Sequence, residues 1–268
     1  MPDKITSVSN ARIRRLVELR KKAKLRRETG LFLIEGTRLC ADTPEPFISE
    51  VFATESWLST APDRERTRIS GFPLTIVSEE VMAKASDTEN PQGILCVTKM
   101  PVYTMEELLG RDKKAEPLLL VLEDIRDPGN LGTIFRTAEA AGATGILMSR
   151  GTVDLFNPKV VRATMSAIFR MPFAVSGDLP ADLQRLREQG IRSYAAHLGG
   201  KRAYDALPLT GGSAFLIGNE GNGLSAEVRE KVTRRLLIPS FRKGDTAESL
   251  NVAIATAITC SEFRRRQD

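Results

Sequence analysis

The strongest constraint on the fold is a series of alternating strand-like and helix-like segments that begins at Leu118. The first segment, LLLVL, has no polar position, which is typical of a parallel strand covered on both faces. Further strand-like runs, such as GILMS and AFLIGN, are separated by segments with helical periodicity. Repeated βα units predict an α/β domain with right-handed crossovers and with its ligand at the carboxyl ends of the strands.

A second, smaller α/β pattern precedes this region. A helix is expected over Ala11–Arg26, with Ser9 as its cap and Gly30 beyond its end, and the short buried strand LFLIEG follows. The charged segment EELLGRDKKAEP lacks an apolar period and closes with a proline, so it is interpreted as a linker. The sequence therefore predicts two domains, residues 1–102 and 118–268, joined by a linker over 103–117.

The positive charge of the chain is concentrated at the N-terminus. Residues 1–30 contain ten Lys or Arg and three Asp or Glu, whereas the remaining residues contain 29 and 31. A charged run is usually a solvated helix face, but this imbalance favours a polyanionic partner, bound in a salt-sensitive way. The apolar face of the segment, Ile13, Leu16 and Leu19, is too small to favour membrane insertion.

Composition argues against several other classes of protein. No apolar run approaches the roughly 20 residues that span a bilayer, and MPDKITSVSN lacks the apolar stretch of a signal peptide. The three cysteines, Cys40, Cys96 and Cys260, show neither metal-ligand spacing nor a disulfide pattern. We therefore expect a cytoplasmic protein with no metal and no membrane association.

Three polar segments follow apolar strands in the C-terminal domain, and each is a candidate for chemistry. The first, EDIRDPGNLGTIFRTA, places Asn130 in the turn and Arg136 about two turns into the helix, where pairing with Glu123 or Glu139 is the purely structural alternative. A dinucleotide-binding turn is disfavoured, because Asp127 occupies the first glycine position of that motif.

The second segment, FLIGNEGNGLS, has the glycine content of a phosphate-binding loop. Glu220 at its centre would repel an anion, which favours a ligand that is neutral or cationic on that side. The third, IPSFRKGDTAESLNVAIATAI, leads into an apolar helix, with Ser249 as the expected N-cap and Asn251 just inside. An asparagine is unfavourable inside a helix, so Asn251 calls for a further reason.

Taken in this order and spacing, these segments resemble the three motifs of the SpoU/TrmH family of RNA ribose methyltransferases, which belongs to the SPOUT superfamily. NPKVVRATMSAIFRMP, between the first two motifs, matches as well. FLIEGTRLC and the basic segment before it resemble the N-terminal substrate-binding domain of the rRNA-type members, which is similar to a small ribosomal protein. The resemblance implies a C-terminal trefoil knot preceded by a small α/β RNA-binding domain, S-adenosylmethionine as cofactor, and a homodimer.

The resemblance also implies roles for individual residues. Arg136 corresponds to the arginine of the first motif, proposed in the family as a general base. Because a guanidinium hardly deprotonates, we prefer a role in orienting phosphate or stabilising an oxyanion. The implied catalytic set is Asn130, Arg136, Glu220, Ser249 and Asn251. The implied cofactor-binding set is Leu216, Gly218, Asn219, Glu220, Gly221, Gly223, Ile238, Leu250, Asn251 and Val252. The expected RNA-binding residues are Arg20, Lys21, Lys22, Lys24, Arg26, Arg27 and Arg38.

Some alternatives stay open at this point. The protein could methylate tRNA rather than ribosomal RNA, or it could be a non-enzymatic RNA-binding module on the same fold. Arg242 and Lys243, in a loop longer than the minimal family loop, would either touch RNA or form a solvated tip. His197 lies in an apolar strand-like run and is interpreted as a packing residue.

Overall fold

The computed structural model describes residues 3–110, 116–196, 203–204, 209–239 and 250–267. The chain forms two compact units, which are described separately. Unit 1 contains Met1–Pro101 and Asp154–Phe169, and unit 2 contains Val102–Val153 and Arg170–Asp268. Residues 154–169 had been expected within the C-terminal domain, whereas their contacts lie with the N-terminal strands.

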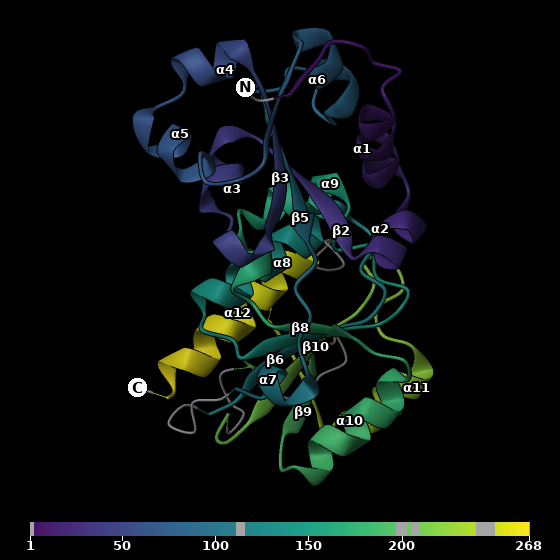
Figure 1. Ribbon diagram of the computed structural model, residues 1–268. Helices are drawn as coiled ribbons and strands as arrows, with labels where there is room; N and C mark the ends of the chain where they lie inside the picture. The colour runs from purple at the N-terminus through teal and green to yellow at the C-terminus, as the bar shows by residue number, and fades with distance from the viewer. Residues whose placement is uncertain (1–2, 111–115, 197–202, 205–208, 240–249, 268) are drawn as a thin grey trace, which may run out of the picture. The chain divides into compact units, whose positions relative to one another are not determined.

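Unit 1 is built on a mixed five-stranded sheet (Figure 1). In sheet order its strands are β1 (Asp3–Ile5), β4 (Leu74–Val77), β3 (Ile48–Thr54), β5 (Ile94–Lys99) and β2 (Leu31–Glu35). The first three run parallel, and β5 is antiparallel to both of its neighbours. The helices are α1 (Ala11–Lys21), α2 (Ala23–Thr29), α3 (Thr37–Asp42), α4 (Glu55–Thr60), α5 (Asp63–Ile69), α6 (Glu79–Ala85) and α9 (Pro158–Thr164), with short 3-10 turns at Glu45–Phe47 and Ala167–Phe169.

The N-terminal helix differs from its expected form at both ends. The amide side chain of Asn10, rather than Ser9, caps α1 by accepting the N–H of Arg12. At Lys22 the backbone becomes extended, with φ −108° and ψ 103°, so the single expected helix is divided into α1 and α2. Gly30 ends α2 in the left-handed conformation, as expected. The apolar residues Ile13, Leu16 and Leu19 are buried in a core shared with α6 and with the sheet.

The inserted segment Asp154–Phe169 is fixed to β2 and its surroundings. The rings of Phe156 and Phe32 lie 4.9 Å apart, and the ring of Phe169 lies 5.1 Å from that of Phe47. Arg162 of α9 donates to Asp87 at 2.8 Å. Because the aromatic rings pack together and the partly exposed ion pair of Arg162 adds a polar contact, this segment is part of the fold of unit 1.

Unit 2 contains a six-stranded sheet in which every strand pair is parallel, as the sequence predicted. In sheet order the strands are β11 (Arg234–Leu236), β9 (Arg192–Ala196), β10 (Ser213–Ile217), β6 (Leu118–Leu122), β7 (Gly145–Met148) and β8 (Phe173–Val175). The central strands β6 and β10 are buried at every position, which agrees with their uninterrupted apolar sequence.

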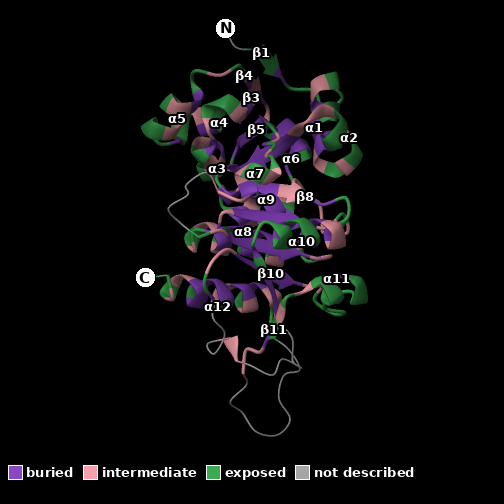
Figure 2. Ribbon diagram, turned by 90° about the horizontal axis from the view of Figure 1, so that it is seen from below, coloured by how far each residue is buried: buried purple, intermediate pink, exposed green. Residues whose placement is uncertain are grey.

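Helices cover both faces of this sheet. Leu119 and Val121 share a core with Leu183 and Leu186 of α10 (Leu179–Glu188), whereas Phe215 meets Phe263 of α12 with ring centroids 6.1 Å apart. The remaining helices are α7 (Met105–Leu108), α8 (Pro128–Ala140), α11 (Ala226–Lys231) and α12 (Val252–Arg265). Helices α8 and α12 lie side by side (Figure 1), and Figure 2 shows the buried strands between helices whose outer faces are exposed.

The segment expected as a linker is structured at its beginning. Helix α7 lies there, and its Leu108 is fully buried in the core of unit 2. Met105, Leu108 and Leu109 supply the apolar positions that the charged composition of the segment concealed. No helix among the described residues is long and apolar enough to cross a membrane.

Candidate active site

The order of the strands brings three polar loops together in unit 2. Strand β6 lies between β10 and β7, and all three run in the same direction. The loops at their carboxyl ends, residues 123–127, 149–153 and 218–225, are therefore neighbours. After β6 the chain forms β7 on one side of β6, and it later returns to form β10 on the other side. Such a reversal of strand order is a topological switch point, where α/β proteins bind ligands, and these loops surround it.

The carboxylate of Glu220 connects the loop after β10 to the start of α8. It accepts the backbone N–H groups of Arg126 and Asp127 and the side-chain amide of Asn130, each at 3.1 Å. The side-chain oxygen of Asn130 accepts the amide of Asn251 at 2.9 Å. Asn130, Glu220 and Asn251, which the sequence placed in three separate motifs, thus form one hydrogen-bonded group.

The surroundings of Glu220 favour its ionised form. Partial burial acts to raise the pKa, but the hydrogen bonds from Asn130 and from the N–H groups of Arg126 and Asp127 outweigh burial, so the pKa of Glu220 lies below its ordinary value. A carboxylate that accepts several N–H groups at a helix N-terminus also interacts favourably with the helix dipole. Glu220 is therefore placed to hold a turn in shape as an anion at neutral pH.

The glycine-rich loop itself is closed by Asn219. The Asn219 side-chain oxygen accepts the N–H groups of Gly221 and Asn222, both at 3.0 Å, and its backbone pairs with that of Gly223. Gly218 lies so close to this turn that a Cβ would approach the carbonyl carbon of Gly223 to 2.3 Å. Since the N–H groups of Gly221 and Asn222 are bonded within the loop, they are not presented to a phosphate. This agrees with the expectation, drawn from Glu220, that the ligand is not an anion on this side.

Asn251 has a different place in its helix from the one expected. Helix α12 begins at Val252, and Asn251 is its N-cap, with the side-chain oxygen accepting the N–H groups of Ala253 and Ile254. The prediction that Asn251 lies inside the helix was therefore wrong. Its side-chain NH2 group, which the cap does not use, donates to the side-chain oxygen of Asn130. Ser249, the expected cap, lies outside the described residues, as do Arg242, Lys243 and His197.

Arg136 makes no hydrogen bond to this group among the described residues. It occupies the exposed face of α8, and the buried face carries Leu131, Ile134 and Phe135. The two carboxylates considered as its structural partners have other contacts: Glu139 pairs with Arg170, and Glu123 accepts the N–H of Ser225 at 2.8 Å. The side chain of Arg136 is thus available to a ligand at the surface.

The expected cofactor-binding residues fall into two groups. Gly221, Gly223 and Leu250 are exposed, and Gly218, Ile238 and Val252 are half-buried, so these positions are accessible. Leu216 is 1% exposed, and its side chain packs in the core with α10 and α11. The expectation that Leu216 walls a pocket is therefore corrected, because strand alternation turns this side chain away from the face that carries Phe215.

The basic residues expected to bind RNA also divide into two groups within unit 1. Lys21, Lys22, Lys24, Arg27 and Arg38 are exposed. Arg26 is 3% exposed and donates to the carboxylate of Asp154 and to the carbonyls of Leu19 and Arg20. Arg20 donates to the carbonyls of Lys84 and Ser86. Arg26 is therefore a structural residue rather than part of a basic surface, a correction that follows from its burial.

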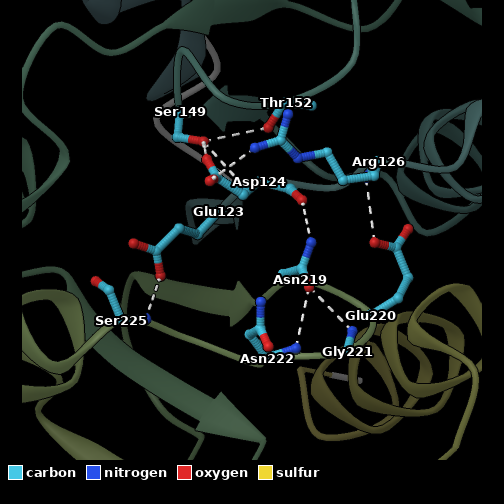
Figure 3. A network of polar contacts seen from close by, with 10 residues as sticks. All are labelled: Glu123, Asp124, Arg126, Ser149, Thr152, Asn219, Glu220, Gly221, Asn222 and Ser225. Atoms are coloured by element: carbon cyan, nitrogen blue, oxygen red, sulfur yellow. Dashed lines mark hydrogen bonds and ion pairs between the residues drawn. The ribbon is translucent and has the colours of Figure 1, made fainter.

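Sequence reasoning missed a second set of polar residues at the same site (Figure 3). Asp124 bonds to Ser149 of the neighbouring loop, and its carbonyl accepts the side-chain amide of Asn219 at 2.8 Å. Two acidic residues directly after the apolar strand LLLVL were the available signal, because charged groups are otherwise unexpected at the end of a buried strand.

Comparison with known proteins agrees with a ligand site of this kind. Residues 117–261 match the SpoU rRNA Methylase family, and residues 10–96 match an MRM3-like substrate binding domain. The chain belongs to the SpoU rRNA methylase family, which confirms the resemblance drawn from the motifs. Among the described residues, no group of three or more His, Cys, Asp or Glu is arranged to hold a metal ion.

Individual relatives extend over nearly the whole chain. The 23S rRNA (guanosine(2553)-2'-O)-methyltransferase RlmP of Bacillus subtilis is 33% identical over 265 residues, covering 97% of this chain and 98% of the relative. The human rRNA methyltransferase 3, mitochondrial, is 29% identical, covering 95% and 72%. The crystal structure of an AdoMet-bound rRNA methyltransferase from Sinorhizobium meliloti matches with a TM-score of 0.82 and 30% identity, over 98% of each chain.

Proposed function

We propose that this protein transfers the methyl group of S-adenosylmethionine to a ribose 2'-hydroxyl of ribosomal RNA. The family membership and the names of the relatives support this activity. The structural observation that carries the proposal is the direct hydrogen bonding of Asn130, Glu220 and Asn251 at the switch point of the sheet. Asn130 lies 90 positions from Glu220 and 121 positions from Asn251 in the sequence, yet it bonds to both, as a site built from separate segments requires.

The cofactor is compatible with the chemistry of the glycine-rich loop. Asn219 already binds the N–H groups that would otherwise favour phosphate, and Glu220 adds a negative charge. S-adenosylmethionine combines a neutral adenosine with a sulfonium cation, and when bound it supplies a methyl group that is already activated. We propose that the backbone near Gly218, Ile238 and Leu250 holds it, with Val252 beside it.

The hydroxyl oxygen would bond to the methyl carbon as the carbon–sulfur bond breaks, and its proton would pass to water, so the residues of this chain have to align the hydroxyl and stabilise the oxygen as it loses the proton. One hydrogen of the Asn130 amide binds Glu220, which leaves its second hydrogen for a ribose oxygen. We assign Glu220 and Asn251 to holding Asn130 and the loop in place. We assign Arg136, which is exposed and carries a guanidinium, to binding the adjacent phosphate or the developing oxyanion. Ser249 stays a member of the proposed catalytic set.

The proposal extends to the organisation of the molecule. Within the expected range 118–268, residues 118–153 and 170–268 would form the knotted methyltransferase domain, and residues 1–102 would bind RNA. The expected linker 103–117 begins with α7, which belongs to unit 2. The exposed basic residues Lys21, Lys22, Lys24, Arg27 and Arg38 are the proposed RNA contacts. The apolar side chains of Leu250 and Ile254, which are 48% and 52% exposed near the start of α12, support a homodimer through this helix. The proposed location is the cytoplasm.

Titration calorimetry with S-adenosylmethionine tests the proposal directly. We expect saturable heat and an increase in the melting temperature for the unmodified protein, and a large loss of affinity for Glu220→Ala. Absence of both heat and thermal shift would favour a non-enzymatic RNA-binding module. A parallel titration with a nicotinamide dinucleotide is the control, and binding of that ligand alone would indicate a different class of enzyme.

A further inference from the structure

Asp124 has a backbone conformation that few residues other than glycine adopt. Its φ of 56° lies in the left-handed region, which asparagine and aspartate tolerate better than most residues do. Non-glycine residues persist in this region when their surroundings hold them there, and they occur preferentially at functional sites. Asp124 is the second residue after β6, at the edge of the sheet where the three loops meet.

The hydroxyl of Ser149 holds Asp124 in this conformation from two directions. It accepts the backbone N–H of Asp124 at 2.9 Å and donates to the carboxylate at 2.7 Å. The hydroxyl of Thr152 lies 3.3 Å from it and completes its hydrogen bonding. Ser149 follows β7, so this contact joins the loops after two neighbouring strands (Figure 3).

The backbone of the loop after β7 also closes over the carboxylate of Asp124. A Cβ on Gly151 would approach the Oδ1 atom of Asp124 to 2.0 Å, so only glycine permits this close approach. The N–H of Val153 donates to the carbonyl of Ile125 at 2.8 Å, which fixes the two loops together a second time. The neighbouring loop therefore contacts Asp124 along one side, while the side chain stays 41% exposed and its carboxylate also pairs with Arg126 at 3.4 Å.

The carbonyl of Asp124 points to the third loop. It accepts the side-chain amide of Asn219 at 2.8 Å, and the other half of that amide binds the N–H groups of Gly221 and Asn222. One asparagine side chain thus shapes the loop that carries Glu220, and its orientation depends on the direction of the Asp124 carbonyl. Figure 3 shows this sequence of contacts from Ser149 through Asp124 to Asn219.

We propose that Asp124 and Ser149 are positioning residues for the cofactor site, acting through Asn219 on the loop of residues 218–223. The left-handed turn directs the Asp124 carbonyl at Asn219, and Ser149 maintains that turn. This inference rests on the proposed function, because it assigns the loop a cofactor to bind. It also changes the interpretation of Asn219, whose side chain shapes the loop rather than touching the cofactor.

Four variants separate this role from a general effect on stability. Asp124→Ala removes the anchor and disfavours the left-handed turn, whereas Asp124→Asn keeps an acceptor oxygen and tolerates that turn. Ser149→Ala removes only the hydroxyl. The matched control is Ser193→Ala in β9, which likewise removes a buried hydroxyl that accepts a backbone N–H, that of Thr233 at 2.9 Å.

Two readouts are needed: amide hydrogen exchange of residues 218–225 in the ligand-free protein, and the Kd for S-adenosylmethionine by calorimetry. For Asp124→Ala and Ser149→Ala we expect roughly tenfold faster exchange in this loop and roughly tenfold weaker binding, since each loses a contact that fixes the turn. Asp124→Asn should recover most of both quantities. Ser193→Ala should change neither of them, although its melting temperature falls.

Unchanged exchange and affinity in a folded Asp124→Ala protein would overturn the inference, and so would equal losses in the Ser193→Ala control. If Asp124→Ala does not fold, loop exchange and cofactor affinity measured in Ser149→Ala decide whether the inference holds. If the unmodified protein does not bind S-adenosylmethionine, the proposed function fails, whereas exchange in the ligand-free loop still decides whether Asp124 and Ser149 shape it.

Discussion

Replacing Arg26 with methionine should destabilise unit 1 far more than the same replacement at Arg27. Arg26 is 3% exposed and binds Asp154 as well as the carbonyls of Leu19 and Arg20, whereas Arg27 is exposed. Methionine keeps the volume and flexibility of the side chain, so the comparison isolates the guanidinium. The two positions are adjacent in α2, and each therefore controls for the other.

The magnitude follows from the contacts that Arg26 makes. Its Nε lies 3.0 Å from the carboxylate of Asp154, and its Nη1 lies 2.6 Å from the Leu19 carbonyl and 2.8 Å from the Arg20 carbonyl. Removing one partner of a buried ion pair costs about 3–5 kcal/mol. Asp154 is 22% exposed and regains some hydration, so the lower end of that range, about 3 kcal/mol, is expected. At roughly 3–4 °C per kcal/mol, the melting temperature should fall by about 10 °C.

Differential scanning calorimetry measures the difference in stability between the two variants. Filter binding to purified ribosomal RNA at two salt concentrations measures their affinity for RNA. Arg27→Met should stay within about 0.5 kcal/mol of the unmodified stability while lowering RNA affinity and the salt slope. Equal, small changes in melting temperature for both variants would refute the structural role of Arg26. Unchanged RNA affinity for Arg27→Met would remove this helix from RNA recognition.

Three further changes test the site in unit 2. Because the pKa of Glu220 is lowered, its carboxylate contributes stability at neutral pH that is lost as the pH falls through its folded-state pKa. The gap in melting temperature between the unmodified protein and Glu220→Gln should be constant from pH 6 to 8 and should shrink below pH 4.5, the ordinary pKa of a glutamate. Gly218→Ala should abolish cofactor binding in calorimetry, because its Cβ would approach Gly223 to 2.3 Å, whereas Gly71→Ala, whose Cβ would meet no atom within 4 Å, should bind normally; equal behaviour would contradict the loop geometry. Arg136→Ala should lower methyl transfer on the order of 100-fold with cofactor affinity nearly intact, and parallel loss of both would show that its role is structural.

The sequence was sufficient to predict the meeting of the three motifs. An uninterrupted apolar strand such as LLLVL requires a covered parallel sheet, and parallel strands deliver their loops to one edge. Asn130 and Glu220 lay in loops that follow predicted strands, so their proximity followed from the fold. Asn251, predicted just inside the last helix, was joined to them only by the resemblance to the family. Their mutual hydrogen bonds did not, because side-chain pairing depends on loop conformation, which has no periodic signal in the sequence.

The predictions that were wrong, for Arg26 and Leu216, and the role of Asp124, which was missed, concern residues whose role is set by distant parts of the chain. Arg26 belongs to a basic run, but Asp154, 128 positions away, takes it into the core of unit 1. Leu216 adjoins the glycine-rich loop, yet the alternation of β10 directs it to the opposite core. Asp124 adopts a left-handed turn because Ser149 supports it from another loop, and local sequence alone does not indicate such support.

The central claim is that three loops hold a methyl donor beside a ribose hydroxyl. It is tested most directly by incubating the protein with S-adenosylmethionine labelled in its methyl group and with ribosomal RNA from cells that lack this protein. After alkaline hydrolysis, the account predicts label in hydrolysis-resistant dinucleotides, which mark 2'-O-methylation, and a large loss of label with Asn130→Ala. Label confined to bases, label accepted by transfer RNA but not by ribosomal RNA, or no transfer at all would contradict it.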